Sequence, residues 1–288
     1  MMTLALAVLL PLRAGAAVAT LDSSFFSARQ AVLSASWNQE ERLLELVRDP
    51  DLQVRVSAVK ALKDHVVYSS RCREVLISVL KDPQQPVSVR REAAKSLSDA
   101  AYEALLDQAR SGDHRDVRQI CYKALYAAAS SRPDVREALA SAAKDESDPV
   151  VRRGAIWGLF ASVGMPEVRR VLFDIAKRDD DGSTRVEALK SLYGAMGLPD
   201  IRQLAVTLAK DSSLAREVRR AAILMLSARV DSDETAVLEE IASRDDDPLL
   251  RQAALTALER TSWETLVYFH SVIRPPYGGV VYDPLDAE

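Results

Sequence analysis

Histidine, cysteine and clustered aspartate are the residue types in this chain that could hold a metal ion or carry a reaction. The 288 residues include three histidines and two cysteines. The histidines are His65, His114 and His270, and none has a carboxylate three or four residues away along the chain. Metal sites on helices draw their ligands from such spacings. The sequence therefore predicts no metal site and no metal cofactor.

Two acidic runs, Asp179-Asp180-Asp181-Gly182 and Asp245-Asp246-Asp247-Pro248, are the candidates for a calcium site. A calcium loop supplies oxygen ligands at alternate positions and closes with a glutamate, and neither run has this pattern. An aspartate before a helix more often accepts hydrogen bonds from the first free N–H groups. We interpret both runs as turns that cap helices.

The two cysteines, Cys72 and Cys121, leave two alternatives open. Both could be packed thiols, since a free cysteine behaves as a small apolar side chain. In an oxidising compartment Cys72 could instead face Cys121 and form a disulfide. Neither alternative supplies a nucleophile beside an acid–base partner, and the sequence predicts no catalytic residue and no cofactor.

An internal repeat in the sequence predicts the secondary-structure elements that would position any functional residue. Seven times, an arginine is followed by a small residue three positions later and by a leucine seven positions later. The steps between successive arginines are 35, 28, 34, 33, 34 and 32 residues. A period of this size predicts one stacked array of similar units. The repeated positions are Arg55/Ala58/Leu62, Arg90/Ala93/Leu97, Arg118/Cys121/Leu125, Arg152/Ala155/Leu159, Arg185/Ala188/Leu192, Arg219/Ala222/Leu226 and Arg251/Ala254/Leu258.

The fourth unit indicates how each repeat folds. Pro133 is favoured at the start of a first helix, and Pro149 belongs to the turn that follows it, because proline cannot continue a helix. A second helix is expected from about Val150 to Val163, ended by Gly164. No segment alternates apolar and polar residues as a strand would. The predicted fold class is all-α, a right-handed α-solenoid of about seven helical hairpins.

The repeat resembles HEAT repeats, specifically the HEAT-like repeats of the phycobilisome-lyase type. The shared string is an aspartate, a variable turn and then Val-Arg-x-x-Ala-x-x-x-Leu, which reads DPDLQVRVSAVKAL in the first unit. The resemblance implies a fold rather than a function. It also implies a ladder of hydrogen bonds between successive units, from the turn aspartates and helix arginines of Asp49/Arg55, Asp179/Arg185 and Asp245/Arg251. HEAT-like hydroxylases hold iron through His-Glu pairs, which this chain lacks.

The segments outside the array are predicted to be a leader, two caps and a tail. An apolar stretch from Met1 to Leu12, followed by small residues at Ala17 and Ala19, has the pattern of a secretory signal and is too short to span a bilayer. We therefore expect export, to a bacterial periplasm or the medium; the alternative is an apolar first helix. The tail either drapes over the last repeat or extends as a ligand for another surface. The predicted organisation is 1–19 signal peptide, 20–37 N-terminal capping helix, 38–260 HEAT-like array, 261–273 C-terminal capping helix and 274–288 irregular tail.

One flank of the second helices carries a pattern of its own. On a helical wheel the first, fifth and eighth residues after each arginine fall together. The fifth-residue column is mostly lysine but holds Trp157 in the central unit, and the eighth-residue column holds three aromatic residues. Gly154 and Gly158 lie beside Trp157 on the wheel and predict a shallow pocket. The candidate binding residues are Trp157, Lys123, Arg153, Lys190, Phe160, Tyr126 and Tyr193.

Two interpretations of these aromatic side chains remain open. They either contact a partner, or they wedge between neighbouring hairpins as part of the core. The net charge of −4, from 38 basic and 42 acidic residues, argues against a nucleic-acid partner, which needs a basic face. We expect a non-enzymatic, exported scaffold that binds a protein or peptide of acidic and partly apolar character along its second-helix face. The alternative is an enzyme or enzyme-accessory subunit of the HEAT-like lyase type.

Overall fold

The computed structural model describes residues 39–227 and 232–259, which hold nearly all of the predicted repeat array. All regular structure in these two ranges is helical, with fourteen α-helices labelled α2 to α15 after a helical stretch at 39–46. The prediction of an all-α solenoid is confirmed. The leader, the two capping helices and the tail predicted from the sequence lie outside the described residues.

The helices alternate between first and second members of seven hairpins. The first members are residues 39–46, α3 (Ser70–Lys81), α5 (Tyr102–Ser111), α8 (Pro133–Asp145), α10 (Pro166–Arg178), α12 (Pro199–Lys210) and α14 (Ser232–Arg244). The second members are α2 (Leu52–Ala61), α4 (Val87–Leu97), α6 (Arg115–Ala124), α9 (Pro149–Gly158), α11 (Gly182–Leu192), α13 (Arg216–Leu226) and α15 (Pro248–Glu259).

Proline and aspartate begin many of these helices; the sequence predicts this for Pro133 and for the two acidic runs, whereas it places Pro149 in the turn. Pro133 and Pro149 stand in the first turn of α8 and α9, where the N–H that proline lacks would have no partner within the helix. The Asp181 carboxylate accepts a hydrogen bond from the backbone N–H of Thr184 at 2.7 Å. Asp247 caps α15 in the same way, accepting from the N–H of Leu249 at 2.9 Å. In both acidic runs an aspartate therefore acts as a helix cap.

The second helices end earlier than the sequence predicts. α9 stops at Gly158 rather than near Val163, and a tighter turn, η3 (Phe160–Ser162), follows it. Other units break at the same place, with η1 (Leu62–Asp64), η2 (Ser98–Ala101), η4 (Tyr193–Ala195) and the short helix α7 (Tyr126–Ser131). In the first six units the eighth residue after the repeat arginine therefore lies beyond the second helix, where a wheel with a constant angle per residue no longer applies; in the seventh unit Glu259 is the last residue of α15.

The repeated small residues and leucines form the core between the two helices of each hairpin. All seven small residues are buried, and so are the leucines of the first six units; Leu159 has no exposed surface. Leu258, in the seventh unit, is only partly buried. The repeat leucines are thus fully buried in six units and only partly buried in the last.

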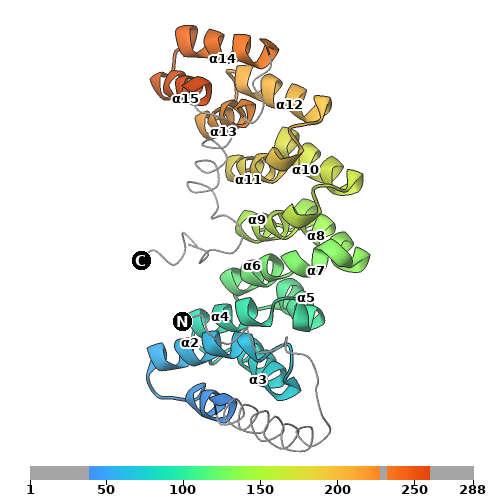
Figure 1. Cartoon of the computed structure of the whole chain (residues 1–288), viewed down its shortest axis with the longest axis vertical. Coiled ribbons are helices and arrows are strands. Elements are labelled where there is room, and N and C mark those ends of the chain that lie inside the picture. The colour runs from blue at the N-terminus through green and yellow to red at the C-terminus, as the bar shows by residue number, and fades with distance from the viewer. Residues whose placement is uncertain (1–38, 228–231, 260–288) are drawn as a thin grey trace, which may run out of the picture.

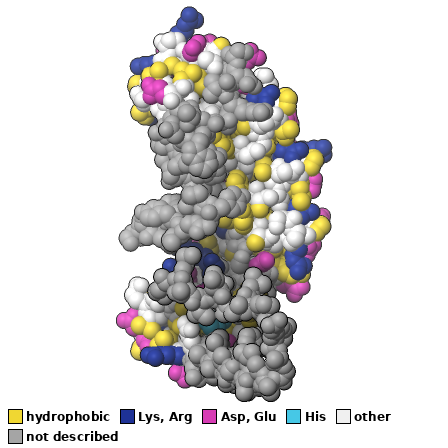
Figure 2. Space-filling view, viewed as in Figure 1, with side chains coloured by type: hydrophobic (Ala, Val, Ile, Leu, Met, Phe, Trp, Pro, Cys, Tyr) yellow, Lys and Arg dark blue, Asp and Glu magenta, His cyan; other side chains and the backbone are white. Residues whose placement is uncertain are grey.

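The hairpins stack so that the second helices form one layer and the first helices the other (Figure 1). Each second helix contacts the second helix of the next unit, from α2 to α15. Both ends of the stack curve toward the second-helix layer, which therefore lines the concave side (Figure 1). On the face seen in Figure 2, apolar side chains run along the middle of the stack and charged side chains lie mainly at its margins.

Candidate binding face

The central step of the stack, from α6 to α9, is built around two glycines. Gly154 and Gly158 are both buried, and α6 and α9 make the most extensive contact of any two described helices. A Cβ on Gly154 would lie 2.6 Å from the backbone oxygen of Gln119, and one on Gly158 would lie 2.7 Å from that of Tyr122. Only residues without a side chain allow this backbone approach. The prediction of a shallow pocket beside Trp157 is therefore wrong, because α6 fills the space along both glycines.

This close approach brings aromatic rings from two units together. Tyr126 follows α6, while Trp157 lies in α9 and Phe160 follows it. The rings of Tyr126 and Trp157 have centroids 5.2 Å apart and are tilted by 57°. Tyr126 and Phe160 are stacked, with centroids 6.4 Å apart and an angle of 19°. All three side chains are half-buried, so each both packs in the stack and presents surface; we call them the aromatic cluster.

Tyr193 does not belong to this cluster. Its side chain is only 5% exposed, and it packs with the buried residues of the core. Burial raises the pKa of Tyr193, and the Ser227 hydroxyl nearby partly offsets this shift. For this residue the wedge interpretation is correct, and its prediction as a binding residue is wrong.

The three predicted basic residues lie on the second helices around the cluster. Lys123, Trp157 and Lys190 occupy equivalent positions in α6, α9 and α11, which contact one another in that order. Neighbouring helices of this kind lie about 8–10 Å apart. Lys123 and Lys190 are half-buried, as is Arg153 in α9. Six of the seven predicted residues thus lie in three adjacent second helices or in the turns that follow them, and we call these six the binding face.

Carboxylates on the same side balance much of this positive charge. Arg153 donates to Asp181 at 3.0 Å, and Lys190 pairs with Glu187 at 3.6 Å. Burial raises the pKa of Asp181, but hydrogen bonds from Thr184 and the charges of Arg153 and Arg152 lower it, and the net shift is downward. These acidic partners are not among the residues predicted from the sequence. The spacing of three between Glu187 and Lys190 would have revealed one of them.

The predicted arginine ladder exists, but its pairs differ from the expected ones. Within a unit, Arg55 donates to the backbone oxygen of Asp49 at 2.7 Å, and Arg251 donates to that of Asp245 at 2.7 Å. Arg185 donates to the backbone oxygen of Ala176 instead. The turn carboxylates pair with the arginine of the preceding unit, because the turn of one hairpin lies against the second helix before it. These pairs are Arg90–Asp113, Arg118–Glu146, Arg152–Asp179 and Arg219–Asp245.

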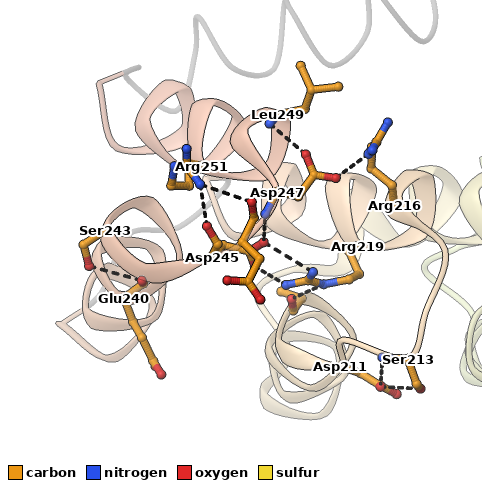
Figure 3. A network of polar contacts seen from close by, with 12 residues as sticks. Asp211, Ser213, Arg216, Arg219, Glu240, Ser243, Asp245, Asp247, Leu249 and Arg251 are labelled. Atoms are coloured by element: carbon orange, nitrogen blue, oxygen red, sulfur yellow. Dashed lines mark hydrogen bonds and ion pairs between the residues drawn. The ribbon is translucent and has the colours of Figure 1, made fainter.

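The Arg219–Asp245 pair shows how one turn binds two arginines. The Asp245 carboxylate accepts from Arg219, and its backbone oxygen accepts from Arg251 (Figure 3). Asp247 in the same run caps α15 and pairs with Arg216 (Figure 3). Two carboxylates of the acidic run that could have suggested calcium, those of Asp245 and Asp247, are therefore directed at arginines and at backbone N–H groups.

The cysteines and the remaining metal-binding residue types form no cluster in the part of the chain that the structure describes. No group of three or more His, Cys, Asp or Glu side chains there could hold a metal ion. Cys72 and Cys121 are both buried and carry free thiols, so the disulfide alternative is not what the structure shows. Burial raises the pKa of Cys121 to about 12. In residues 39–227 and 232–259, no helix combines the length and apolar character needed to cross a membrane.

Paired helices, one concave layer of second helices and an arginine ladder between units define an α-solenoid built from helical repeats. The family model for HEAT repeats matches residues 40–125, 102–193 and 170–259, which together span most of the chain. The protein therefore belongs to the HEAT-repeat family.

Solved structures of similar fold include several HEAT-like proteins. The complex of CpcE and CpcF of phycocyanin lyase from Nostoc sp. PCC7120 has 18% identity and a TM-score of 0.41, over 81% of this chain and 94% of that one. Human deoxyhypusine hydroxylase has 20% identity and a TM-score of 0.37, over 76% and 83%. A mutant of Kap121p has 14% identity and a TM-score of 0.52, over 81% and 30%. At such identities the likeness shows the fold alone. None of the curated proteins searched matches the chain.

Proposed function

We propose that this chain is a non-enzymatic HEAT-repeat scaffold that binds a protein or peptide on the binding face of α6, α9 and α11. The observation that carries the proposal is the aromatic cluster on the concave layer. Concave solenoid layers commonly serve as binding surfaces. Half-exposed aromatic rings near the centre of a face supply large apolar area at a small cost in conformational entropy.

The charges around the cluster indicate how the partner is recognised. Arg153 and Lys190 each face a carboxylate of the same chain, at 3.0 Å and 3.6 Å. An acidic partner would compete with Asp181 and Glu187 for these cations, and the gain in charge energy would be small. Acidic groups would therefore contribute mainly to the rate and salt dependence of association, while the rings would contribute most of the affinity.

Peptide binding by Trp157 variants tests the proposal. Peptides selected from a random library against the wild-type chain would be labelled, and their affinity measured by fluorescence anisotropy. Trp157→Ala should weaken binding by about 2 kcal/mol or more, roughly 30-fold, while Trp157→Phe should retain most of the affinity. Tyr68→Ala is the matched control, since Tyr68 is an aromatic residue 90% exposed in the turn before α3.

Thermal unfolding of the same variants separates binding from packing. A sharp fall in melting temperature for Trp157→Ala, with unchanged peptide affinity, would show that the indole belongs to the core and that the proposal is wrong. Equal affinity losses for Trp157→Ala and Tyr68→Ala would also contradict it, because they would show binding without preference for the concave face.

The proposal includes export, which rests on the leader-like segment 1–19. Expression of the full chain in a bacterium with a periplasm should yield protein outside the cytoplasm that begins near Thr20. Mass spectrometry of the intact protein measures the start directly. Soluble cytoplasmic protein that retains Met1 would refute export and leave the binding proposal intact.

A further inference from the structure

Arginines of the second helices hold successive hairpins together through two kinds of contact at once. Arg152 of α9 donates to the backbone oxygen of Glu146 in its own hairpin at 2.8 Å and to the Asp179 carboxylate of the next hairpin at 3.0 Å. We call this arrangement a clamp, because one planar guanidinium fixes the turns of two hairpins relative to each other. Three other arginines each bind a backbone oxygen of their own hairpin and a carboxylate of the next in the same way: Arg90, Arg118 and Arg219.

The clamp is missing between the fifth hairpin, α10 and α11, and the sixth, α12 and α13. Arg185 of α11 donates to the backbone oxygen of Ala176 at 3.0 Å but does not pair with Asp211, the turn carboxylate of the sixth hairpin. Among the residues that the structure describes, no ion pair joins these two hairpins. Every other junction has at least one ion pair: Arg71–Glu41, Arg90–Asp113, Arg118–Glu146, Arg152–Asp179 and Arg219–Asp245.

A neighbouring serine binds the carboxylate that would complete this clamp. Asp211 accepts from the backbone N–H of Ser213 at 3.0 Å and from its hydroxyl at 2.6 Å (Figure 3). In the fifth hairpin Asp179 accepts from the N–H of Asp181 at 2.9 Å, and an ionised aspartate side chain has no second donor to offer. The pKa of Asp211 is lowered by the hydrogen bonds from Ser213 and further by the charge of Arg185. The guanidinium is therefore near this carboxylate without binding it.

The apolar packing at this junction also leaves room for movement. A Cβ on Gly182, at the start of α11, would lie 3.7 Å from the Val218 side chain of α13, which is an ordinary contact. At the junction of α6 and α9, by contrast, the backbones themselves meet at Gly154 and Gly158. Apolar burial is non-directional, and packed helices without fixed polar contacts can slide by small amounts.

From these observations we propose that the solenoid bends at the junction of the fifth and sixth hairpins, because this junction lacks the clamp. The described residues up to 198 move as one body, and 199–227 with 232–259 move as a second. The binding face ends at α11, directly before the junction, so bending changes the distance from this face to α13 and α15. The inference goes beyond the proposed function and does not rest on it, since the movement belongs to the chain alone.

Double electron–electron resonance on the full chain measures the movement. Nitroxide labels would be attached through Glu103→Cys, Arg170→Cys and Ala236→Cys, at exposed positions on the first helices α5, α10 and α14. The native cysteines are buried, so the introduced thiols react first. The label pairs 103/170 and 170/236 each span two junctions, about 20 Å of stacked helices, and only 170/236 includes the junction without a clamp. Its distance distribution should be about twice as wide as that of 103/170.

A substitution in the turn of the sixth hairpin tests the cause. Ser213→Ala removes the hydroxyl donor and leaves Asp211 free to accept from Arg185, so the 170/236 distribution should narrow to about the width of 103/170. Ser212→Ala is the matched control, because Ser212 is exposed in the same turn and should leave the width unchanged. Adding Asp211→Asn to Ser213→Ala removes the charge that Arg185 would bind, and the distribution should widen again.

Two results would overturn the proposal. The first is a wild-type 170/236 distribution no wider than that of 103/170, which would show that the stack does not bend at this junction. The second is the same width for Ser213→Ala and Ser212→Ala, which would show that the missing clamp is not the cause of bending. Circular dichroism of each labelled variant confirms that the helices are intact before the widths are compared.

Discussion

Helices α4 and α9 occupy equivalent places in two hairpins, yet they approach the preceding helix in different ways. Six residues after the repeat arginine, α4 has Ser96, whose hydroxyl donates to the backbone oxygen of Val59 at 3.1 Å. At the same position α9 has Gly158, where even a Cβ would come within 2.7 Å of the Tyr122 oxygen. Since the serine side chain fits in one place and could not fit in the other, α9 lies closer to its neighbour than α4 does.

The same two helices also differ on the surface they present. Two residues after its arginine α4 has Glu92, which pairs with Lys95 at 3.6 Å. α9 has Gly154 and Trp157 at those positions, and the indole meets Tyr126 of the preceding unit. α11 follows the α4 pattern with Glu187 and Lys190. The glutamate–lysine pair is thus shared by α4 and α11, while the two glycines and the aromatic cluster distinguish the central unit.

The largest expected effect concerns the core position at which α4 and α9 should behave alike. Leu97 and Leu159 both have no exposed surface. Leu97→Ala and Leu159→Ala should each lower the free energy of unfolding by about 2–5 kcal/mol, through lost apolar burial and the cavity left behind. Urea denaturation followed by circular dichroism measures both. A loss below about 0.5 kcal/mol at Leu159 would contradict the repeat assignment.

The second prediction concerns the position at which α4 and α9 should behave differently, Ser96 in α4 and Gly158 in α9. In an ordinary exposed helix, replacing glycine with alanine gains about 1 kcal/mol. Gly158→Ala should instead cost about 1–3 kcal/mol, because the new methyl group meets the backbone of α6 and the side chain of Leu139. Ser96→Ala should cost about 1 kcal/mol for its lost hydrogen bond. Near-UV circular dichroism should change for the Gly158 variant, as the rings of Tyr126 and Trp157 separate, and should stay unchanged for the Ser96 variant.

A stabilised Gly158→Ala variant would show that α6 can move away without loss. The close approach of the two backbones would then not be what holds the aromatic cluster together. Gly164→Ala serves as the control, since a Cβ at Gly164 meets nothing within 4 Å.

The comparison also shows which features the sequence could reveal. The spacing of Arg152, Ala155 and Leu159 predicts the hairpin and its core, because residues three, four and seven apart share one helical face. The same rule fails for Tyr126, Phe160 and Tyr193, since the second helix ends before the eighth position and each ring is placed by the turn that follows. The three rings differ in exposure, since Tyr193 is buried while Tyr126 and Phe160 are half-buried. This difference depends on the neighbouring units and not on local spacing.

The charged partners were equally hard to predict, for a related reason. The resemblance to HEAT-like repeats indicated a ladder, and a ladder is present. The partner of each carboxylate is set by how one hairpin lies on the next, so Asp179 pairs with Arg152 of the preceding unit. The two glycines led to a wrong prediction. Residues without a side chain suggested open space beside Trp157, but Gly154 and Gly158 face a helix from another unit.

The smallest expected change in stability concerns the ion pairs made by the surface cations of α4 and α9. Arg153 of α9 reaches across to Asp181 of the next unit, whereas Lys95 of α4 pairs within its own helix. Asp181→Asn keeps the helix cap, because asparagine caps as well as aspartate, and removes only the charge. At neutral pH it should cost well under about 1 kcal/mol, and Glu92→Gln about 0.2–0.5 kcal/mol.

The pH dependence of stability distinguishes Asp181 from an incidental surface charge. The pKa of Asp181 is lowered in the folded chain, where the hydrogen bonds from Thr184 and the charges of Arg153 and Arg152 outweigh the raising effect of burial. Such a carboxyl stabilises the fold above its unfolded pKa of about 3.9, and this contribution is lost as the pH falls through the lower folded value. Wild type should therefore be more stable than Asp181→Asn at neutral pH, and the difference should shrink below about pH 4. Urea denaturation of both proteins between pH 7 and pH 3 measures the difference; a constant offset over that range would show that the Asp181 charge does not join α9 to α11.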